Sequence, residues 1–300
     1  MTMDNSLQHF ALSDILTMEQ SENNLTKLVI NNAFAEAEIY LQGAHLTHFQ
    51  PHGEEALIFD GKNSVVTPPQ SVHAGIPICW PWFGPHPSDA TKPQHGFARD
   101  VLWDLKSTKA LSSGETEVVL NMGNTTKSHH LFPYAFNVEV TFTIGHTLQI
   151  ALTTTNLDTC AFTITQALHS YFAISDLDAV QIEGVTNTSF VDYTDEKKEK
   201  SEVHLLKIEQ EVNRVYLPTQ STCVIKDSAL KRKIVVEKEG SNSTTIWNPW
   251  SESGIHDLPN TAYRCFVCIE TTNALSDAKT IAPQQSHCIK QIISVNTLEV

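Results

Sequence analysis

The sequence predicts an all-β protein, built as a large antiparallel β-sandwich. Short segments in which apolar and polar residues alternate recur along most of the chain, and this period is typical of half-buried strands. Turn residues separate these segments, as they do between antiparallel strands. The chain lacks the regular succession of strand and helix that a parallel sheet requires. We find no boundary between domains and expect one domain over residues 1–300, with 1–20 as a lead-in segment.

The alternation is clearest in three places. In residues 33–41, Ala35, Ala37 and Ile39 share one face. Residues 136–144 and 147–155 predict a hairpin around Gly145-His146. Shorter strands are expected at 27–30, 45–49, 116–121, 162–167, 179–183, 222–227, 233–237, 243–247, 265–270 and 287–295. Residues 7–20 predict a short surface helix or an irregular segment, and the charged run at 195–200 predicts a solvated loop.

Composition excludes several classes of partner. Hydrophobic residues make up 41% of the chain, enough for a large core. The formal net charge of −14 argues against nucleic acid and against an anionic membrane surface, because both need clustered Lys and Arg. It leaves a small anionic substrate possible, since one or two local cations suffice to bind it.

The sequence lacks the features expected of a secreted or membrane-spanning protein. The first twenty residues lack the pattern of a secretory signal, and no apolar run reaches the ~20 residues of a membrane helix. The six cysteines are scattered, as is typical of reduced thiols. We therefore expect a cytoplasmic monomer.

The segment 71–99 stands out as a long connection rich in both Pro and Gly. It contains five prolines and three glycines, which exclude a long helix or a central strand. It also contains large apolar side chains, including Trp80 and Trp82, so it is not a flexible linker. The composition predicts a rigid, packed loop that holds His95, Arg99 and His73 against a cleft.

Three motifs place a titratable residue beside aromatic ones: His95-Gly96-Phe97-Ala98-Arg99, Leu168-His169-Ser170-Tyr171-Phe172 and Phe266-Val267-Cys268-Ile269-Glu270. Burial in such surroundings moves a pKa toward neutrality, which suits acid–base chemistry. Each residue also has a plainer interpretation. Glu270 can be a strand-end carboxylate in water, and His169 a core histidine bonded to a backbone carbonyl. Asp192 can bind hydroxyl groups or serve as a turn residue.

The sequence gives no sign of a metal or nucleotide site. His45 and His48 lie three apart on a presumed strand, as do Cys265 and Cys268, so each pair points to opposite faces. A glycine-rich phosphate loop is absent from the sequence. We expect neither a metal nor a cofactor.

Together the motifs resemble the aldose 1-epimerase (galactose mutarotase-like) superfamily, and within it the D-hexose-6-phosphate mutarotases, also called glucose-6-phosphate 1-epimerases. The segments that carry the resemblance are 41–45, 75–84, 95–99, 168–172, 247–249 and 266–270. The resemblance implies a β-sandwich whose active site lies on the concave face of a large sheet. It also implies exchange of the α and β anomers of a hexose 6-phosphate by ring opening and reclosure.

The same resemblance implies a role for each candidate residue. Glu270 would be the base and His169 the acid. His95 would bond the C1 oxygen or a neighbouring hydroxyl, Asp192 would hold sugar hydroxyls, and Arg99 would bind the phosphate. Trp82 and Phe83, with Trp80, would form the wall of the loop.

One position departs from the family pattern. This chain has His73-Ala74-Gly75 where the family commonly has Arg-Gly-Gly. Histidine is shorter than arginine and only partly charged near neutral pH, so His73 is a weaker candidate contact for phosphate. Phosphate binding is then reduced or carried by another cation, or an unphosphorylated sugar is preferred. Other classes left open are a non-catalytic carbohydrate-binding module and a structural or partner-binding β domain.

Overall fold

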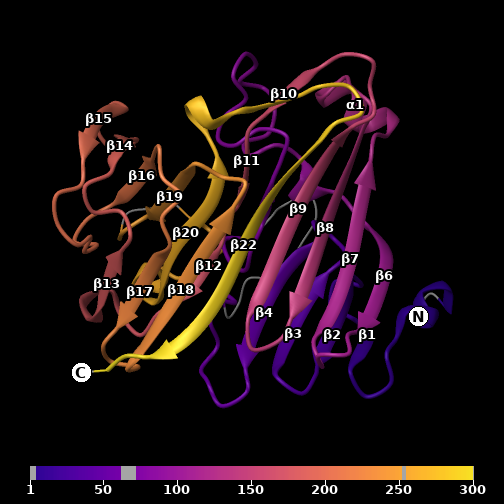
Figure 1. Ribbon diagram of the computed structural model, residues 1–300, viewed down its shortest axis with the longest axis horizontal. Helices are drawn as coiled ribbons and strands as arrows, with labels where there is room; N and C mark the ends of the chain where they lie inside the picture. The colour runs from indigo at the N-terminus through magenta and orange to yellow at the C-terminus, as the bar shows by residue number, and fades with distance from the viewer. Residues whose placement is uncertain (1–4, 62–71, 252–254, 300) are drawn as a thin grey trace.

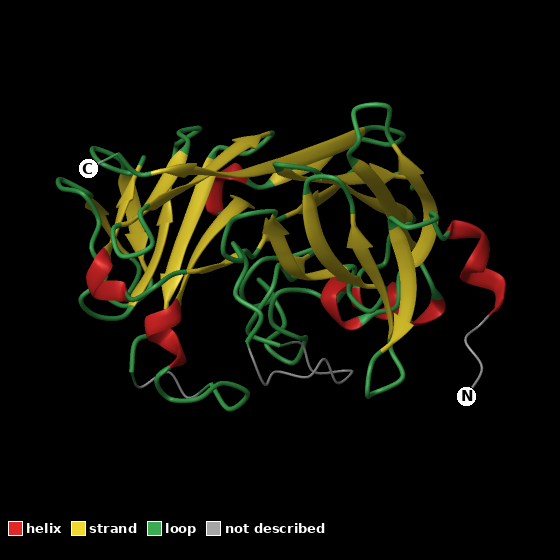
Figure 2. Cartoon of the chain, turned by 90° about the horizontal axis from the view of Figure 1, so that it is seen from below, coloured by secondary structure: helices red, strands yellow, loops and turns green. Residues whose placement is uncertain are grey.

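The computed structural model describes residues 5–61, 72–251 and 255–299, and it confirms the all-β prediction. Its strands form two eight-stranded sheets, a four-stranded sheet and a two-stranded ribbon. The pairs between named strands are antiparallel. Figure 2 shows strands of both halves of the molecule joined along one side, with loops filling the middle of the other side.

The first eight-stranded sheet spans the whole molecule, in the order β13-β17-β18-β22-β9-β8-β7-β6. Its long C-terminal strand β22 pairs with β9 along its first part and with β18 along its last part, so it joins the two halves (Figure 1). The predicted hairpin of β8 and β9 is confirmed, with strictly alternating burial. The strands are β6 (Asp104–Ala110), β7 (Thr116–Gly123), β8 (Phe136–Ile144), β9 (Leu148–Asn156), β13 (Val180–Glu183), β17 (Cys223–Asp227), β18 (Arg232–Glu239) and β22 (Ser286–Thr297).

The four-stranded sheet lies behind β6 to β9 in Figure 1 and is ordered as in the chain. It comprises β1 (Leu16–Gln20), β2 (Thr26–Asn31), β3 (Ala35–Tyr40) and β4 (His45–Pro51). The prediction for residues 7–20 was wrong in its second half, because 16–20 form strand β1. Leu16 and Met18 point into the core and β1 pairs with β2, a contact that the short segment does not reveal by itself.

The second eight-stranded sheet packs against the other half of the first. Its order is β15-β14-β16-β19-β20-β11-β5, with β12 also paired to β20. The strands are β5 (Ile78–Cys79), β11 (Gln166–Leu168), β12 (Tyr171–Ala173), β14 (Ser189–Asp192), β15 (Lys198–Ser201), β16 (Val212–Tyr216), β19 (Ser243–Asn248) and β20 (Phe266–Asn273). The charged run expected to be a solvated loop was misjudged in part, because residues 198–201 form the edge strand β15.

Short elements complete the fold. The single strand expected at 162–167 is divided into β10 (Phe162–Ile164), which pairs with β21 (Lys279–Ile281), and β11 in another sheet. One short α-helix, α1 (Thr126–Leu131), begins where the Thr125 hydroxyl accepts a hydrogen bond from the Ser128 amide. The 3-10 turns are η1 (Asn5–Phe10), η2 (Ala98–Asp100), η3 (Leu177–Ala179), η4 (Ala262–Cys265) and η5 (Leu275–Asp277).

The long connection is packed as predicted, although its first residue, at position 71, lies outside the described residues. Trp80 is fully buried in the main core and donates through Nε1 to the Thr154 hydroxyl at 3.0 Å. Gly96 has a φ of +75°, and a Cβ there would lie 1.9 Å from the Trp80 carbonyl oxygen. Glycine at position 96 therefore allows two parts of the connection to touch, which fixes where the residues beside it point.

Candidate active site

A cavity of about 640 Å³ opens on the second eight-stranded sheet. Its floor comes from strands β16, β19 and β20 and from the chain between β11 and β12. The long connection forms one wall, through Trp82, Phe83, His95 and Arg99, and His73 lies at its edge. The structure thus brings together seven of the eight candidate residues: His73, Trp82, Phe83, His95, Arg99, His169 and Glu270.

Glu270 lies in the floor of the cavity and not at a strand end in water. It is 1% exposed, inside β20, and shares its face with Phe266 and Cys268 as the alternation of the strand predicted. One of its carboxylate oxygens, Oε2, is buried with no hydrogen-bond partner among the described residues. Burial raises the pKa of Glu270 well above its ordinary value, because a charged carboxylate loses its water there.

His169 lies beside Glu270 because of the pairing of β20 with its neighbours. Leu168 is paired with Thr271, and Tyr171 with Cys268, so the two residues between, His169 and Ser170, face Glu270 and Ile269. His169 Nε2 is 3.6 Å from Glu270 Oε1.

The surroundings of His169 favour a neutral ring. Its Nδ1 is buried and has no hydrogen-bond partner within the described ranges, which contradicts the interpretation of a core histidine satisfied by a backbone carbonyl. The ring stacks on Tyr171, with centroids 4.9 Å apart. Burial, together with the nearby His95, Arg99 and His73, lowers the pKa of His169 well below its ordinary value.

His95 faces His169 from the long connection, with ring centroids 5.8 Å apart and the planes nearly perpendicular. The Gly84 amide donates to His95 Nδ1 at 3.1 Å, so a neutral His95 ring carries its proton on Nε2. Burial, with Arg99 and His73 nearby, lowers the pKa of His95 to about 3. His95 is therefore a neutral ring, and its Nε2 lies 3.2 Å from the side-chain amide nitrogen of Gln94.

Arg99 supplies a positive charge to the wall of the cavity. It belongs to η2, and its Nη2 donates to the Gln94 carbonyl oxygen at 3.0 Å. Its Nε is buried with no partner in the described part of the chain. A guanidinium with donors to spare in a cavity can bind an anionic group.

The other residues expected in the cavity wall differ in exposure and in their hydrogen bonds. His73 is about two-fifths exposed, and its Nδ1 lies 2.7 Å from Asp257 Oδ1. Trp82 is almost buried and donates through Nε1 to the Pro93 carbonyl at 2.8 Å, while the Phe83 amide donates to the Thr165 hydroxyl. Trp80 belongs to the core and does not line the cavity, contrary to the expectation for it.

Asp192 does not line the cavity. At the end of β14 its Oδ1 accepts from the Thr194 amide and hydroxyl, and its Oδ2 accepts from Lys200 Nζ at 2.8 Å. This is the turn role that the sequence left as its alternative, and Lys200 comes from the strand β15 that the sequence did not reveal. The next residue, Tyr193, lines the cavity instead.

Several lining residues were missed by reasoning from sequence. Thr245 on β19 is paired directly with Glu270, is 2% exposed, and has a hydroxyl with no partner among the described residues. Asn213 on β16 and Lys197 in the turn before β15 also line the cavity. Trp247 and Tyr171 also line the cavity, and both stand in motifs that the sequence had singled out, at 247–249 and 168–172. The others became recognisable only through strand pairing.

The described residues contain no group of three or more His, Cys, Asp or Glu side chains placed to hold a metal ion. Cys265 and Cys268 are separate, one exposed in η4 and one buried in β20. Among the described helices, none is both long and apolar enough to cross a membrane.

A proton donor and acceptor in contact, with hydrogen-bonding groups around them, can move protons on a bound molecule.

Comparison with known proteins agrees with this geometry. Residues 26–294 match the model of the aldose 1-epimerase family, so the chain belongs to the aldose 1-epimerase family, as its motifs had suggested. A relative from Escherichia coli (strain K12), named "Putative glucose-6-phosphate 1-epimerase", is 30% identical over 284 residues, covering 94% of each chain. A relative of the same name from Salmonella typhimurium (strain LT2) is 31% identical over 278 residues, covering 92% of this chain and 90% of its own.

Solved structures confirm the fold. The crystal structure of a "putative mutarotase" from Salmonella typhimurium superposes with a TM-score of 0.88 at 29% identity, covering 96% of this chain and 95% of the other. A galactose mutarotase-like protein from Clostridium acetobutylicum has a TM-score of 0.74 at 13% identity, covering 94% and 98%. The latter supports the β-sandwich fold alone.

Proposed function

We propose that this protein interconverts the α and β anomers of a hexose 6-phosphate such as glucose 6-phosphate. The observation that carries the proposal is the buried contact of Glu270 with His169 at the floor of the cavity. Burying a carboxylate beside an imidazole costs stability, so the pair calls for a functional explanation. Each residue also has an atom without a partner among the described residues, Oε2 in Glu270 and Nδ1 in His169.

The reaction needs one proton acceptor and one proton donor. Glu270, as a carboxylate, takes the proton of the C1 hydroxyl, and the electron pair left on that oxygen forms the aldehyde C=O. The bond from C1 to the ring oxygen breaks, and the ring oxygen takes a proton from the His169 imidazolium. The aldehyde then turns about the C1–C2 bond, and the same steps run backward to close the ring as the other anomer.

The pair returns to its starting state after each turnover. Before ring opening it is carboxylate and imidazolium, and afterwards carboxyl and neutral imidazole, so it holds one proton throughout. Burial raises the pKa of Glu270, and burial with the nearby positive groups lowers that of His169. Both shifts favour the carboxyl and neutral imidazole, the form that accompanies the open chain. Because Glu270 and His169 share one proton, their apparent pKa values belong to the pair and not to either residue.

The surrounding residues would orient the sugar. His95, a neutral ring, would bond the C1 oxygen or its neighbour through Nε2, in place of its contact with Gln94. Arg99 would bind the phosphate, and the relatives named for glucose 6-phosphate support an anionic substrate. We leave Asp192 out of the substrate contacts, because Thr194 and Lys200 already occupy its carboxylate. Trp82, Phe83 and His73 would form the wall.

We further infer that the protein works as a cytoplasmic monomer. All six cysteines are free, which suits a reducing compartment, and phosphorylated sugars are substrates of the cell interior. Its partners are then small sugar phosphates.

The direct test is anomer exchange measured by NMR, on glucose 6-phosphate and on free glucose and galactose, with spontaneous mutarotation as the control. We expect acceleration that is much larger for the phosphate than for the free sugars. Acceleration of free sugars alone would move the assignment to an unphosphorylated substrate. Binding of sugar without any acceleration would contradict the enzymatic proposal and indicate a carbohydrate-binding module.

A further inference from the structure

Gln291 interrupts an apolar row on the inner face of the long strand β22. The row is Ile289, Gln291 and Ile293, and all three side chains are fully buried. By the alternation of the strand, an aliphatic residue is the expected occupant of position 291. Burying an amide costs free energy unless its groups are bonded, so the position calls for an explanation.

The amide of Gln291 crosses the sandwich interior to the sheet that carries the cavity. Its Oε1 accepts from the Ser170 hydroxyl at 2.5 Å. Its Nε2 donates to the Ile269 carbonyl oxygen at 3.3 Å and to the Thr271 hydroxyl at 3.1 Å. Because a carbonyl can only accept, the contact with Ile269 fixes which end of the amide faces β20.

These three partners are the chain neighbours of the acid and the base. Ser170 follows His169, while Ile269 and Thr271 stand on either side of Glu270. Since successive side chains of a strand point to opposite faces, Glu270 points into the cavity while Thr271 points toward Gln291. We propose that Gln291 is a positioning residue, which holds His169 and Glu270 at their working distance from behind the sheet. This inference rests on the proposed function of the cavity.

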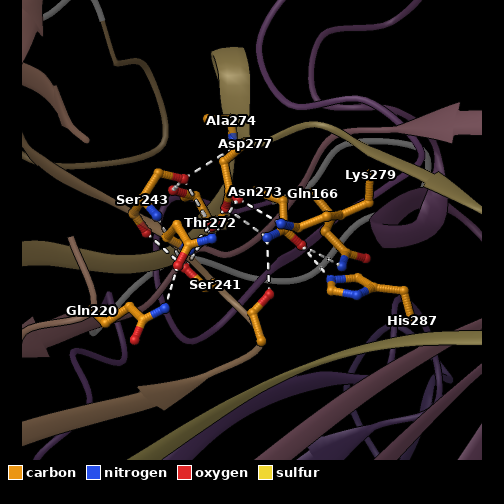
Figure 3. Close-up of polar contacts among 12 residues, drawn as sticks. Gln166, Gln220, Ser241, Ser243, Thr272, Asn273, Ala274, Asp277, Lys279 and His287 are labelled. Carbon is orange, nitrogen blue, oxygen red and sulfur yellow. Dashed lines mark hydrogen bonds and ion pairs between the residues drawn. The ribbon is translucent and has the colours of Figure 1, made fainter. Parts of the chain in front are cut away.

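The two sides of this link are not equally secured by other contacts. Beyond Glu270, β20 ends at Asn273, which accepts from Gln166 Nε2 and donates to Asp277, with His287 Nε2 2.9 Å from its side-chain oxygen (Figure 3). His169 lies in the break between β11 and β12, where the ladder is interrupted, and the backbone there is held by the His169 amide donating to the Pro77 carbonyl at 3.0 Å and the Ile269 amide donating to the Ser170 carbonyl at 3.3 Å. Loss of the Gln291 link should therefore displace His169 more than Glu270.

The test uses isosteric variants. Gln291→Met removes the whole link, and Ser170→Ala removes only the side toward His169. Thr271→Val removes only the side toward Glu270. Thr116→Val is the matched control, because Thr116 is equally buried and its hydroxyl accepts from Asn32 in a distant part of the core. The measurements are kcat, KM and the pH profile of kcat for glucose 6-phosphate, thermal unfolding, and histidine ring signals in long-range ¹H–¹⁵N spectra.

For Gln291→Met and Ser170→Ala we expect kcat to fall about 10- to 100-fold with KM changed less than about threefold, because misplacement near 1 Å costs ~10²-fold in rate. In these two variants the pH profile of kcat should shift and the His169 ring signals should move. In Thr271→Val the fall in kcat and both of these shifts should be smaller. Thr116→Val should lose stability alone. The inference is wrong if Gln291→Met loses stability as the control does but keeps kcat, pH profile and ring signals.

The experiment separates this inference from the proposed function. If the wild type is active and Gln291→Met behaves like the control, only the positioning role fails. If the wild type has no activity on any sugar, the proposed function fails, and the ring signals alone still decide whether Gln291 sets the position of His169. If Gln291→Met does not fold, Ser170→Ala carries the same test from the His169 side.

Discussion

His169 Nε2 lies 3.6 Å from Glu270 Oε1, and strand pairing places them there. The pairs Leu168 with Thr271 and Tyr171 with Cys268 leave His169 opposite Glu270 on neighbouring antiparallel segments. Both side chains are buried, and each has an atom without a partner among the described residues.

Glu270→Gln should abolish most of the activity without unfolding the protein. The amide fits the same space but cannot accept the proton of the C1 hydroxyl. We expect the rate of anomer exchange to fall by ~10²–10⁴-fold, the usual contribution of one acid–base group. The control is Glu239→Gln, since Glu239 is a largely exposed carboxylate on β18. Unchanged exchange in Glu270→Gln would contradict the role of Glu270 as base.

The same variant should be at least as stable as the wild type, increasingly so as pH rises. Because the folded-state pKa of Glu270 is raised, its stabilising contribution is fully present below the unfolded value near 4.5 and is lost as pH rises through the folded value. Glutamine has no such dependence. Urea unfolding of both proteins between pH 4 and pH 9 measures the difference, which should grow with pH. A difference that shrinks as pH rises would show that Glu270 is charged and stabilised in the folded protein.

The pH profile of kcat should be bell-shaped, with a plateau between an acid limb and an alkaline limb. The pair is active with one proton, so activity is lost when the pair gains a second proton and when it loses its last one. The lowered pKa of His169 moves the acid limb below 6.5, and the raised pKa of Glu270 moves the alkaline limb well above 4.5. Measuring kcat at saturating glucose 6-phosphate reduces the influence of substrate ionisation. An acid limb above 6.5 would contradict the assignment of His169.

Arg99→Lys should weaken binding of the sugar phosphate more than binding of a free sugar. Lysine keeps the charge but loses the planar fork that matches phosphate. We expect KM for glucose 6-phosphate to rise about 10-fold or more, as for loss of a hydrogen bond to a charged group. Lys290→Gln removes a cation on β22, away from the cavity lining, and serves as the control. An equal rise in KM for free glucose would point to a structural role for Arg99.

His73→Arg tests the departure of this chain from its family pattern. His73 stands at the cavity edge beside Asp257, which an arginine could also pair with. The longer, permanently charged side chain should lower KM for glucose 6-phosphate several-fold while leaving kcat within about twofold. His73→Gln, which removes the ring without adding charge, is the comparison variant. No change in KM for either variant would mean that His73 lies outside the reach of the phosphate.

Much of the fold was readable from local patterns. The alternation in β3, β8 and β9 predicted strands, and the structure confirms them with the same residues buried. The face shared by Phe266, Cys268 and Glu270 also followed from alternation alone. What failed were short or highly charged segments such as β1 and β15, which are strands only because a neighbouring strand pairs with them.

The features of the candidate site also fall into those that local patterns predicted and those that depend on strand pairing. Local patterns in the chain were enough to predict the all-β class, the packed loop rich in Pro and Gly, and the motifs that carry His95, His169 and Glu270, because strand period and backbone restriction are local properties. The burial of Glu270, the position of Tyr193 rather than Asp192 at the cavity, and the place of Gln291 and Thr245 beside the acid and the base follow only from the three-dimensional arrangement. These depend on which distant strands pair and in what register. Burial, pKa and contact between residues far apart in the chain arise from that arrangement, and no local pattern encodes it.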